Sequence, residues 1–119
     1  YAPLPGQTIN GQQTLGENIS DLGGVKLAYD GLQRALERRP TGKIDNYTPE
    51  QRFFLSFATI WRTKTRNEAL IDQLRTGNHS PARYRVLGPL ANVPEFAQAF
   101  SCPAGAPMMR AASEQISIW

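Results

Sequence analysis

Two carboxylates four residues apart, Glu17 and Asp21, are the first candidates for chemistry in this sequence. Residues at this spacing lie on the same face of a helix, so both side chains can address one point in space. Such a pair can form half of a metal site, with one carboxylate as a ligand and the other as a support for a second ligand. The alternative is that acidic residues in a first helical turn only complement the helix dipole.

The carboxylate of Glu17 also has a competing local role. Thr14 precedes it by three residues, which is the spacing of a capping box, where the Glu side chain accepts from the backbone N–H of the capping residue. One carboxylate cannot easily serve both as a cap and as a metal ligand. The spacing alone leaves both interpretations open.

Two further polar side chains, His79 and Arg85, lie six residues apart later in the chain. The planar guanidinium of arginine can bind a substrate carbonyl or brace a carboxylate, although a surface ion pair is the simpler interpretation. His79 is the only histidine, and a lone histidine is more commonly a capping or surface residue than a catalytic one. Arg83 is the substitute candidate if Arg85 is buried in a structural bridge.

Helices must position these residues, and the hydrophobic periodicity predicts several of them. We expect helices from Thr14 to Pro40, from Pro49 to Trp61, from Asn67 to Arg75 and from Val93 to Phe100. The segment from Tyr84 to Leu87 is expected to be extended, and residues 1–13 are expected to be irregular because they are rich in Pro, Gly and Gln. The predicted fold class is mainly α, with several helices around one core, irregular loops and little or no sheet.

Two features of these helices bear on packing. The second helix carries an apolar stripe that consists of Phe53, Phe54, Phe57, Ile60 and Trp61. The first helix contains Gly23 and Gly24, each of which costs about 1 kcal/mol relative to alanine in an exposed helix. We favour close approach of another backbone as the reason for this pair, over a break in the helix.

The bulk properties exclude some classes of function. Thirteen Lys and Arg against ten Asp and Glu give a net charge of +3, which is too small and too evenly mixed to predict a nucleic-acid surface. No apolar run approaches the roughly 20 residues that cross a bilayer, so no membrane span is expected in this segment. The single Cys102 excludes an internal disulfide. Apolar residues near the C-terminus predict a docked tail, namely Ile116, Ile118 and Trp119.

Four stretches of the sequence resemble the neprilysin family of zinc metallopeptidases, in that family's order. The segment from Glu17 to Gly24, Glu-Asn-Ile-Ser-Asp-Leu-Gly-Gly, is similar to the family's E-N-x-x-D-x-G-G motif. The other three are the aromatic helix from Phe53 to Trp61, the H-S-P-x-x-[FY]-R segment from His79 to Arg85, and the stretch from Asn92 to Cys102 together with Trp119. The resemblance covers nearly the whole chain and is to the C-terminal part of such enzymes.

The resemblance implies a zinc site that other polypeptide completes. Glu17 would be the third protein ligand of the zinc, and Asp21 would accept the free ring N–H of a histidine ligand. His79 would donate a hydrogen bond to the oxyanion of the tetrahedral intermediate, and Arg85 would bind the substrate. The two His ligands and the catalytic Glu, from an H-E-x-x-H motif, would lie upstream of Tyr1.

The implied function is that of a zinc metalloendopeptidase which hydrolyses oligopeptides before bulky apolar residues. Ile60 and Trp61 would line the pocket for the residue that follows the scissile bond. Because this chain has no H-E-x-x-H motif, we predict that it is inactive alone. Its expected partners are a peptide substrate and the N-terminal remainder of the parent peptidase. Residues 1–119 are predicted to form a single segment of a zincin-type catalytic domain.

Two other interpretations stay open at this point. One is a catalytically inactive helical interaction module that descends from such an enzyme and has lost the metal. The other is a free-standing all-α binding domain that is unrelated to peptidases. The resemblance suggests a periplasmic, secreted or membrane-anchored extracytoplasmic location.

In animal relatives a cysteine at the place of Cys102 is tied to a distant part of the protein, and another lies where this chain has Ile116. The pairing of Cys102 is therefore left open.

Overall fold

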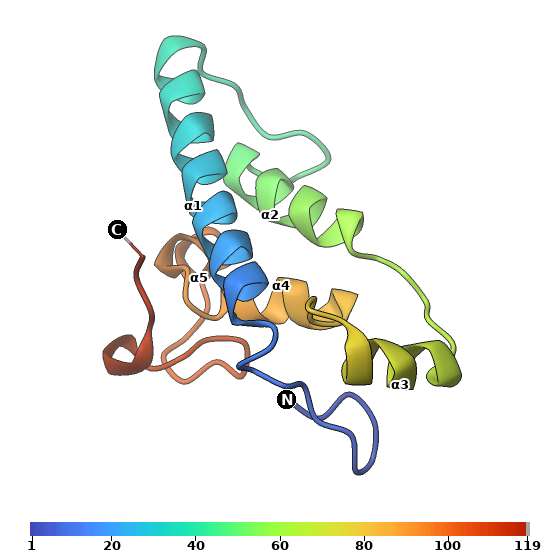
Figure 1. Ribbon diagram of the computed structural model, residues 1–119. Helices are drawn as coiled ribbons and strands as arrows, with labels where there is room; N and C mark the ends of the chain where they lie inside the picture. The colour runs from blue at the N-terminus through green and yellow to red at the C-terminus, as the bar shows by residue number, and fades with distance from the viewer. Residues whose placement is uncertain (119) are drawn as a thin grey trace.

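The computed structural model describes residues 1–118, and these form a mainly helical structure, as the sequence predicts (Figure 1). Five α-helices occur in the order α1 (Leu15–Arg38), α2 (Pro49–Ile60), α3 (Asn67–Thr76), α4 (Ala82–Leu90) and α5 (Pro94–Ala99), followed by a 3₁₀ turn at Ala112–Glu114. The described residues contain no β-strand and only two isolated β-bridges, each of which lies within a turn. Among these residues no helix combines the length and the apolar character that spanning a bilayer requires.

Helix α1 is the longest element and carries the two carboxylates. Of the two interpretations left open for its start, the capping box does not form, because the Thr14 side chain makes no capping hydrogen bond. Instead, the Thr14 hydroxyl donates to the carbonyl of Asn10 at 3.0 Å and accepts from the side-chain amide of Asn18 at 3.0 Å. The carboxylate of Glu17 is therefore released from a capping role and can act elsewhere.

The helix runs without a break through the glycine pair. Gly23 is buried, but a Cβ built on Gly24 meets no atom within 4 Å. The described residues supply no backbone that approaches Gly24 closely, so close approach there by another part of the parent protein stays a prediction. The alternative, a helix break at the pair, is wrong. Gly24 lies beside open space on the face that carries Asp21.

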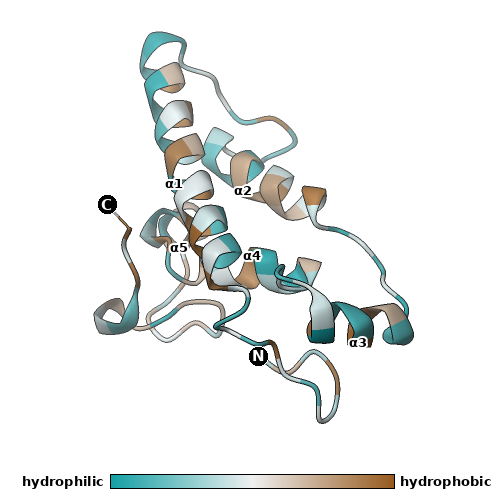
Figure 2. Ribbon diagram, in the orientation of Figure 1, coloured by the Kyte–Doolittle hydropathy of each residue, from teal (hydrophilic) through white to brown (hydrophobic). Residues whose placement is uncertain are grey.

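Helix α2 starts where the local sequence predicts. Thr48 and Gln51 form a complete capping box and Pro49 occupies the first helical position. The core lies between α1, α2, α4 and α5, with Phe54 only 1% exposed and packed against the rings of Tyr29 and Phe96. The hydrophilic residues gather on α3 and at the far end of α1 (Figure 2).

Helix α4 corrects one expectation, since Tyr84 to Leu87 is helical and not extended. Pro89 lies inside this helix and removes one backbone donor from it. The segment is helical because it packs along α1, which buries Pro89 and Leu90 in the core region. Helix α5 forms close to its predicted position.

The C-terminal tail packs back on the helices, as its apolar residues predict. The backbone N–H of Ile116 donates to the Asn92 side chain at 3.0 Å, and Ile118 packs against the core. Cys102 is half-buried against the same core and carries a free thiol. Trp119, the third residue of the predicted docked tail, lies outside the described residues.

Candidate active site

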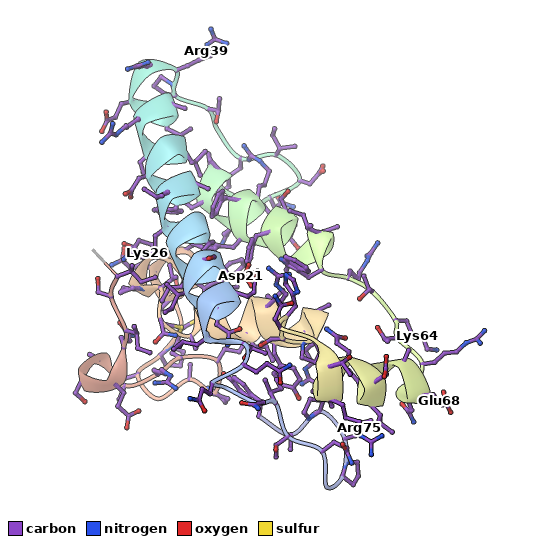
Figure 3. All side chains as sticks on the ribbon, in the orientation of Figure 1. Asp21, Lys26, Arg39, Lys64, Glu68 and Arg75 are labelled. Carbon is purple, nitrogen blue, oxygen red and sulfur yellow. The ribbon has the colours of Figure 1, made fainter. Side chains whose placement is uncertain are left out.

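Glu17 and Asp21 lie on successive turns of α1 and face the start of α4. Figure 3 shows Asp21 on the part of α1 next to α4. The Glu17 side chain is 36% exposed and that of Asp21 is 12% exposed. The predicted common face of the two carboxylates is therefore present, with one open to solvent and the other mostly covered.

His79 and Arg85 come from the segment that joins α3 to α4 and from the first turns of α4. The imidazole Nε2 of His79 lies 3.0 Å from Oε2 of Glu17, and the same oxygen is 3.8 Å from a terminal nitrogen of Arg85. The fold thus brings together all four polar residues that the sequence singled out. The His79 side chain remains 46% exposed, so the cluster opens to solvent on that side.

Arg85 and Asp21 form the most closely bonded pair of the cluster. Two parallel hydrogen bonds of 2.7 Å join Nε and Nη2 of Arg85 to the two carboxylate oxygens. The Asp21 hydrogen bonds raise the pKa of the Arg85 guanidinium further above its already high usual value. Arg85 is 15% exposed and held in this bridge through Nε and Nη2, but its Nη1 takes no part in the bridge, so Arg85 stays the candidate for substrate binding and the exposed Arg83 is not needed as its substitute.

The end of α2 contributes the aromatic part of the site. The guanidinium of Arg85 lies over the Trp61 ring at 4.1 Å from its centroid, a cation–π contact that holds the fork in place. Ile60 is exposed and lines, together with Asp21, a mostly apolar groove of about 300 Å³ between α1 and α2. The groove reaches the open side of Gly24.

A second cavity, of about 330 Å³, lies away from these residues. It is lined by Leu15, Ile19 and Leu22, which occupy the other face of α1, together with Tyr84 of α4. Neither Glu17 nor Asp21 lines it. Since no titratable member of the polar cluster reaches this cavity, we assign the candidate active site to the Glu17 side of α1.

One contact at the site was not anticipated from the sequence. The buried hydroxyl of Ser80 donates to Oδ1 of Asn18 at 2.7 Å, and Asn18 in turn donates to Thr14. Asn18 neighbours Glu17, and Ser80 neighbours His79, so this bond fixes the His79 segment against α1. No local signal could have revealed it, because the partners are 62 residues apart.

The comparison with known families settles the relationship that these motifs indicate. The model of peptidase family M13 matches residues 2–116. The chain belongs to peptidase family M13. It is 42% identical to neprilysin-3 of Drosophila melanogaster over 98% of the chain, and 42% identical to human endothelin-converting enzyme-like 1 over 95% of the chain. It spans about 15% of the length of either relative.

Solved structures of the family share the fold of this M13 chain. The cryo-EM structure of the Mycobacterium tuberculosis zinc metalloprotease Zmp1 in an open state matches 100% of the chain with a TM-score of 0.94 at 37% identity. The crystal structure of Zmp1 with an inhibitor matches 98% with a TM-score of 0.92. The chain covers 19% and 18% of those two proteins. The helical fold is therefore that of one part of an M13 peptidase.

The described residues of this M13 chain do not form a complete metal site by themselves. Within residues 1–118, no group of three or more His, Cys, Asp and Glu side chains is placed to hold a metal ion. Glu17 is the more accessible of the two carboxylates, with a side chain that is 36% exposed. The chemistry of the cluster therefore fits one oxygen ligand from this chain, with further ligands from elsewhere.

Proposed function

We propose that this chain supplies part of the active site of a zinc metalloendopeptidase. One observation carries the proposal: Glu17 and Asp21 of α1 meet His79 and Arg85, which follow them by about 60 residues, at distances of 2.7–3.8 Å. The family membership and the similarity to a zinc metalloprotease support the same assignment. Residues 1–119 then act as one segment of the catalytic domain.

Glu17 would hold the zinc as the third protein ligand, beside two histidines from the N-terminal remainder of the parent. Its exposed carboxylate supports this role. When bound, such a zinc lowers the pKa of a water molecule to near neutrality and polarises a carbonyl. An H-E-x-x-H helix would bring the two histidines and a general base.

Asp21 would orient one histidine ligand. Both of its oxygens accept from Arg85, but a carboxylate has about four acceptor positions, so it can also accept an imidazole N–H. That bond would fix the tautomer of the ligand, and the loss of such a partner typically costs 10–100-fold in metal affinity or activity. The Arg85 bridge holds the carboxylate rigidly for this purpose.

His79 would act on the substrate carbonyl. Its Nε2 lies beside Glu17, so a proton held there can be donated to an oxygen that approaches the same space. Charge develops on that oxygen only in the transition state, which makes the bond useful for rate rather than for substrate binding. Removal of one such donor typically lowers kcat by about 10²–10³-fold.

Arg85, Ile60 and Trp61 would bind the substrate. The Asp21 bridge uses two of the five N–H donors of the guanidinium, and Nη1 makes no hydrogen bond with the described residues, so it can donate to a peptide carbonyl. The groove at Ile60 is mostly apolar, which suits a bulky apolar side chain after the scissile bond. The ring of Trp61 packs against the guanidinium of Arg85 and holds it in position.

The proposed partners are a peptide substrate and the N-terminal remainder of the parent peptidase. Without that remainder the chain lacks the H-E-x-x-H residues, so the segment alone is expected to be inactive. The family resemblance suggests a periplasmic, secreted or membrane-anchored extracytoplasmic location. No role in nucleic-acid binding is proposed, because the net charge is only +3.

The decisive experiment is to extend the polypeptide upstream until it includes the missing motif, add zinc, and assay a peptide with Phe or Leu after the cleavage point. Glu17→Ala should abolish zinc binding. His79→Ala should lower kcat and leave zinc bound. If both variants cleave as well as the unmodified protein, the assigned roles are wrong. If the extended wild-type protein binds no zinc and cleaves nothing, the inactive interaction module replaces this proposal.

A further inference from the structure

The positive charge of this chain is concentrated in one stretch of sequence, which also contains three residues of the proposed substrate site. Residues 61–85 hold six of the 13 Lys and Arg and two of the ten Asp and Glu, a net charge of +4. The rest of the chain holds seven cations and eight anions, a net charge of −1. The overall +3 therefore conceals a segment that is strongly basic and coincides with the elements that carry Trp61, His79 and Arg85.

Five of these cations have no side-chain partner among residues 1–118. Arg85 is held by Asp21, but the other five are exposed and make no ion pair or side-chain hydrogen bond with the described residues. They are Arg62, Lys64, Arg66, Arg75 and Arg83. Exposed and unpaired cations are available to an external anion, and a cluster of one sign raises the local concentration of oppositely charged ligands.

The position of three of them relates the cluster to one end of a bound peptide. Arg62, Lys64 and Arg66 lie on the segment that leaves the end of α2 and runs to α3 (Figure 3). This segment begins directly after Trp61, whose ring contacts Arg85, and after Ile60, which lines the groove beside Asp21. A peptide whose apolar residue enters that groove, and whose following residues pass the end of α2, would meet the cationic segment next.

We infer that the site prefers peptides with acidic side chains on the C-terminal side of the scissile bond, beyond the apolar residue that enters the groove. The inference rests on the proposed function and adds a substrate class to it. The exposed cations are screened by salt, so the preference should be strongest at low ionic strength.

The test uses the full-length, zinc-loaded parent enzyme and three amidated peptides. They share one sequence with Phe after the cleavage point and differ only in the next two residues, which are Glu-Glu, Gln-Gln or Lys-Lys. Amidation removes the terminal carboxylate, so that only side-chain charge varies. We expect kcat/KM for the Glu peptide to exceed that for the Gln peptide by about fivefold at low salt and the Lys peptide to be the poorest, with the differences shrinking near 0.5 M salt.

Charge reversal locates the effect. The triple variant Arg62→Glu, Lys64→Glu and Arg66→Glu should reverse the order of the Glu and Lys peptides and change kcat/KM for the Gln peptide by less than about twofold. The matched control reverses three cations at the other end of the molecule, Arg38→Glu, Arg39→Glu and Lys43→Glu, and should keep the wild-type order. In Figure 3 Arg39 and Lys64 lie far apart.

The outcomes separate this inference from the proposed function. If the wild-type enzyme cleaves none of the peptides, the proposed function fails. If it cleaves the Glu and Gln peptides equally at low salt, or if the control variant loses the preference as well, the acidic-substrate inference is wrong. Should the triple Glu variant fail to fold, the milder Arg62→Gln, Lys64→Gln and Arg66→Gln variant must abolish the preference. Inhibition by a short oligonucleotide in place of any peptide preference would also overturn the inference.

Discussion

The bridge between Arg85 and Asp21 offers the sharpest test of the site geometry in this chain. We expect Asp21→Asn to destabilise the fold, because it removes the charge that two hydrogen bonds of 2.7 Å join to Arg85. The side chains are 12% and 15% exposed, so the pair lies between a surface ion pair, worth about 0–1 kcal/mol, and a buried one, whose disruption costs about 3–5 kcal/mol. After this substitution the carboxylate of Glu17, whose Oε2 lies 3.8 Å from Nη2 of Arg85, still offsets part of the charge of the guanidinium.

The expected cost of Asp21→Asn is therefore about 2 kcal/mol in the free energy of unfolding. In a chain of this length that corresponds to a fall in Tm of about 8 °C. Arg85→Lys keeps the charge but loses the fork and the contact with Trp61, and it should cost about 1–2 kcal/mol. Thermal unfolding followed by circular dichroism measures both.

A double-mutant cycle isolates the bridge from other effects of each change. Arg85→Gln combined with Asp21→Asn should cost about 2 kcal/mol less than the sum of the two single changes. Arg75→Gln is the control, since Arg75 is exposed and makes no ion pair with the described residues. If Asp21→Asn lowers Tm no more than this control, or if the two changes at the bridge are additive, the reasoning from the 2.7 Å fork is wrong.

Three further predictions concern the contacts that hold the site. Ser80→Ala should lower the free energy of unfolding by about 1–2 kcal/mol, because it leaves Oδ1 of Asn18 without its donor. Urea denaturation measures this change, and an unchanged unfolding midpoint would show that the bond does not contribute to stability. Phe54→Ala should cost about 3–5 kcal/mol through the cavity that it opens, with exposed Leu55→Ala as a control in the same unfolding assay. Hydrogen bonds from its own backbone N–H and from Thr48 lower the pKa of Glu50 below 4.5, so its contribution to stability is present above that pH and is lost as the pH falls through the folded-state pKa. Glu50→Gln should accordingly lower Tm at pH 7 and match the wild type near about pH 2, and an equal difference at both pH values would contradict this assignment.

The sequence alone determined the features that depend on neighbours within one or two helical turns. Thr48, Pro49 and Gln51 specify the start of α2 through contacts that span three residues, and the structure has that start. The apolar stripe likewise identified Phe54 as a core residue. The mainly α fold class follows from such local patterns, because helix periodicity and caps are short-range properties.

The tertiary structure decided the points at which local signals competed. Thr14 and Glu17 have the spacing of a capping box, but Thr14 bonds to Asn10 and Asn18 instead. Tyr84 to Leu87 is helical despite the following Gly-Pro pair, because α4 packs along α1. In both places a long-range contact or a different local bond outweighs the propensity that the sequence displays.

The candidate site also has some features that the local sequence determines and others that only the packing of the helices determines. The carboxylates at positions 17 and 21 had to share a face once α1 formed, since a helix places such residues together. Which cation each carboxylate would meet was not determined locally: Arg85 and Asp21 are 64 residues apart, and only the packing of α4 on α1 makes the fork possible. A charged side chain has many candidate partners in a sequence, and the fold selects one by bringing it within hydrogen-bond distance and away from water.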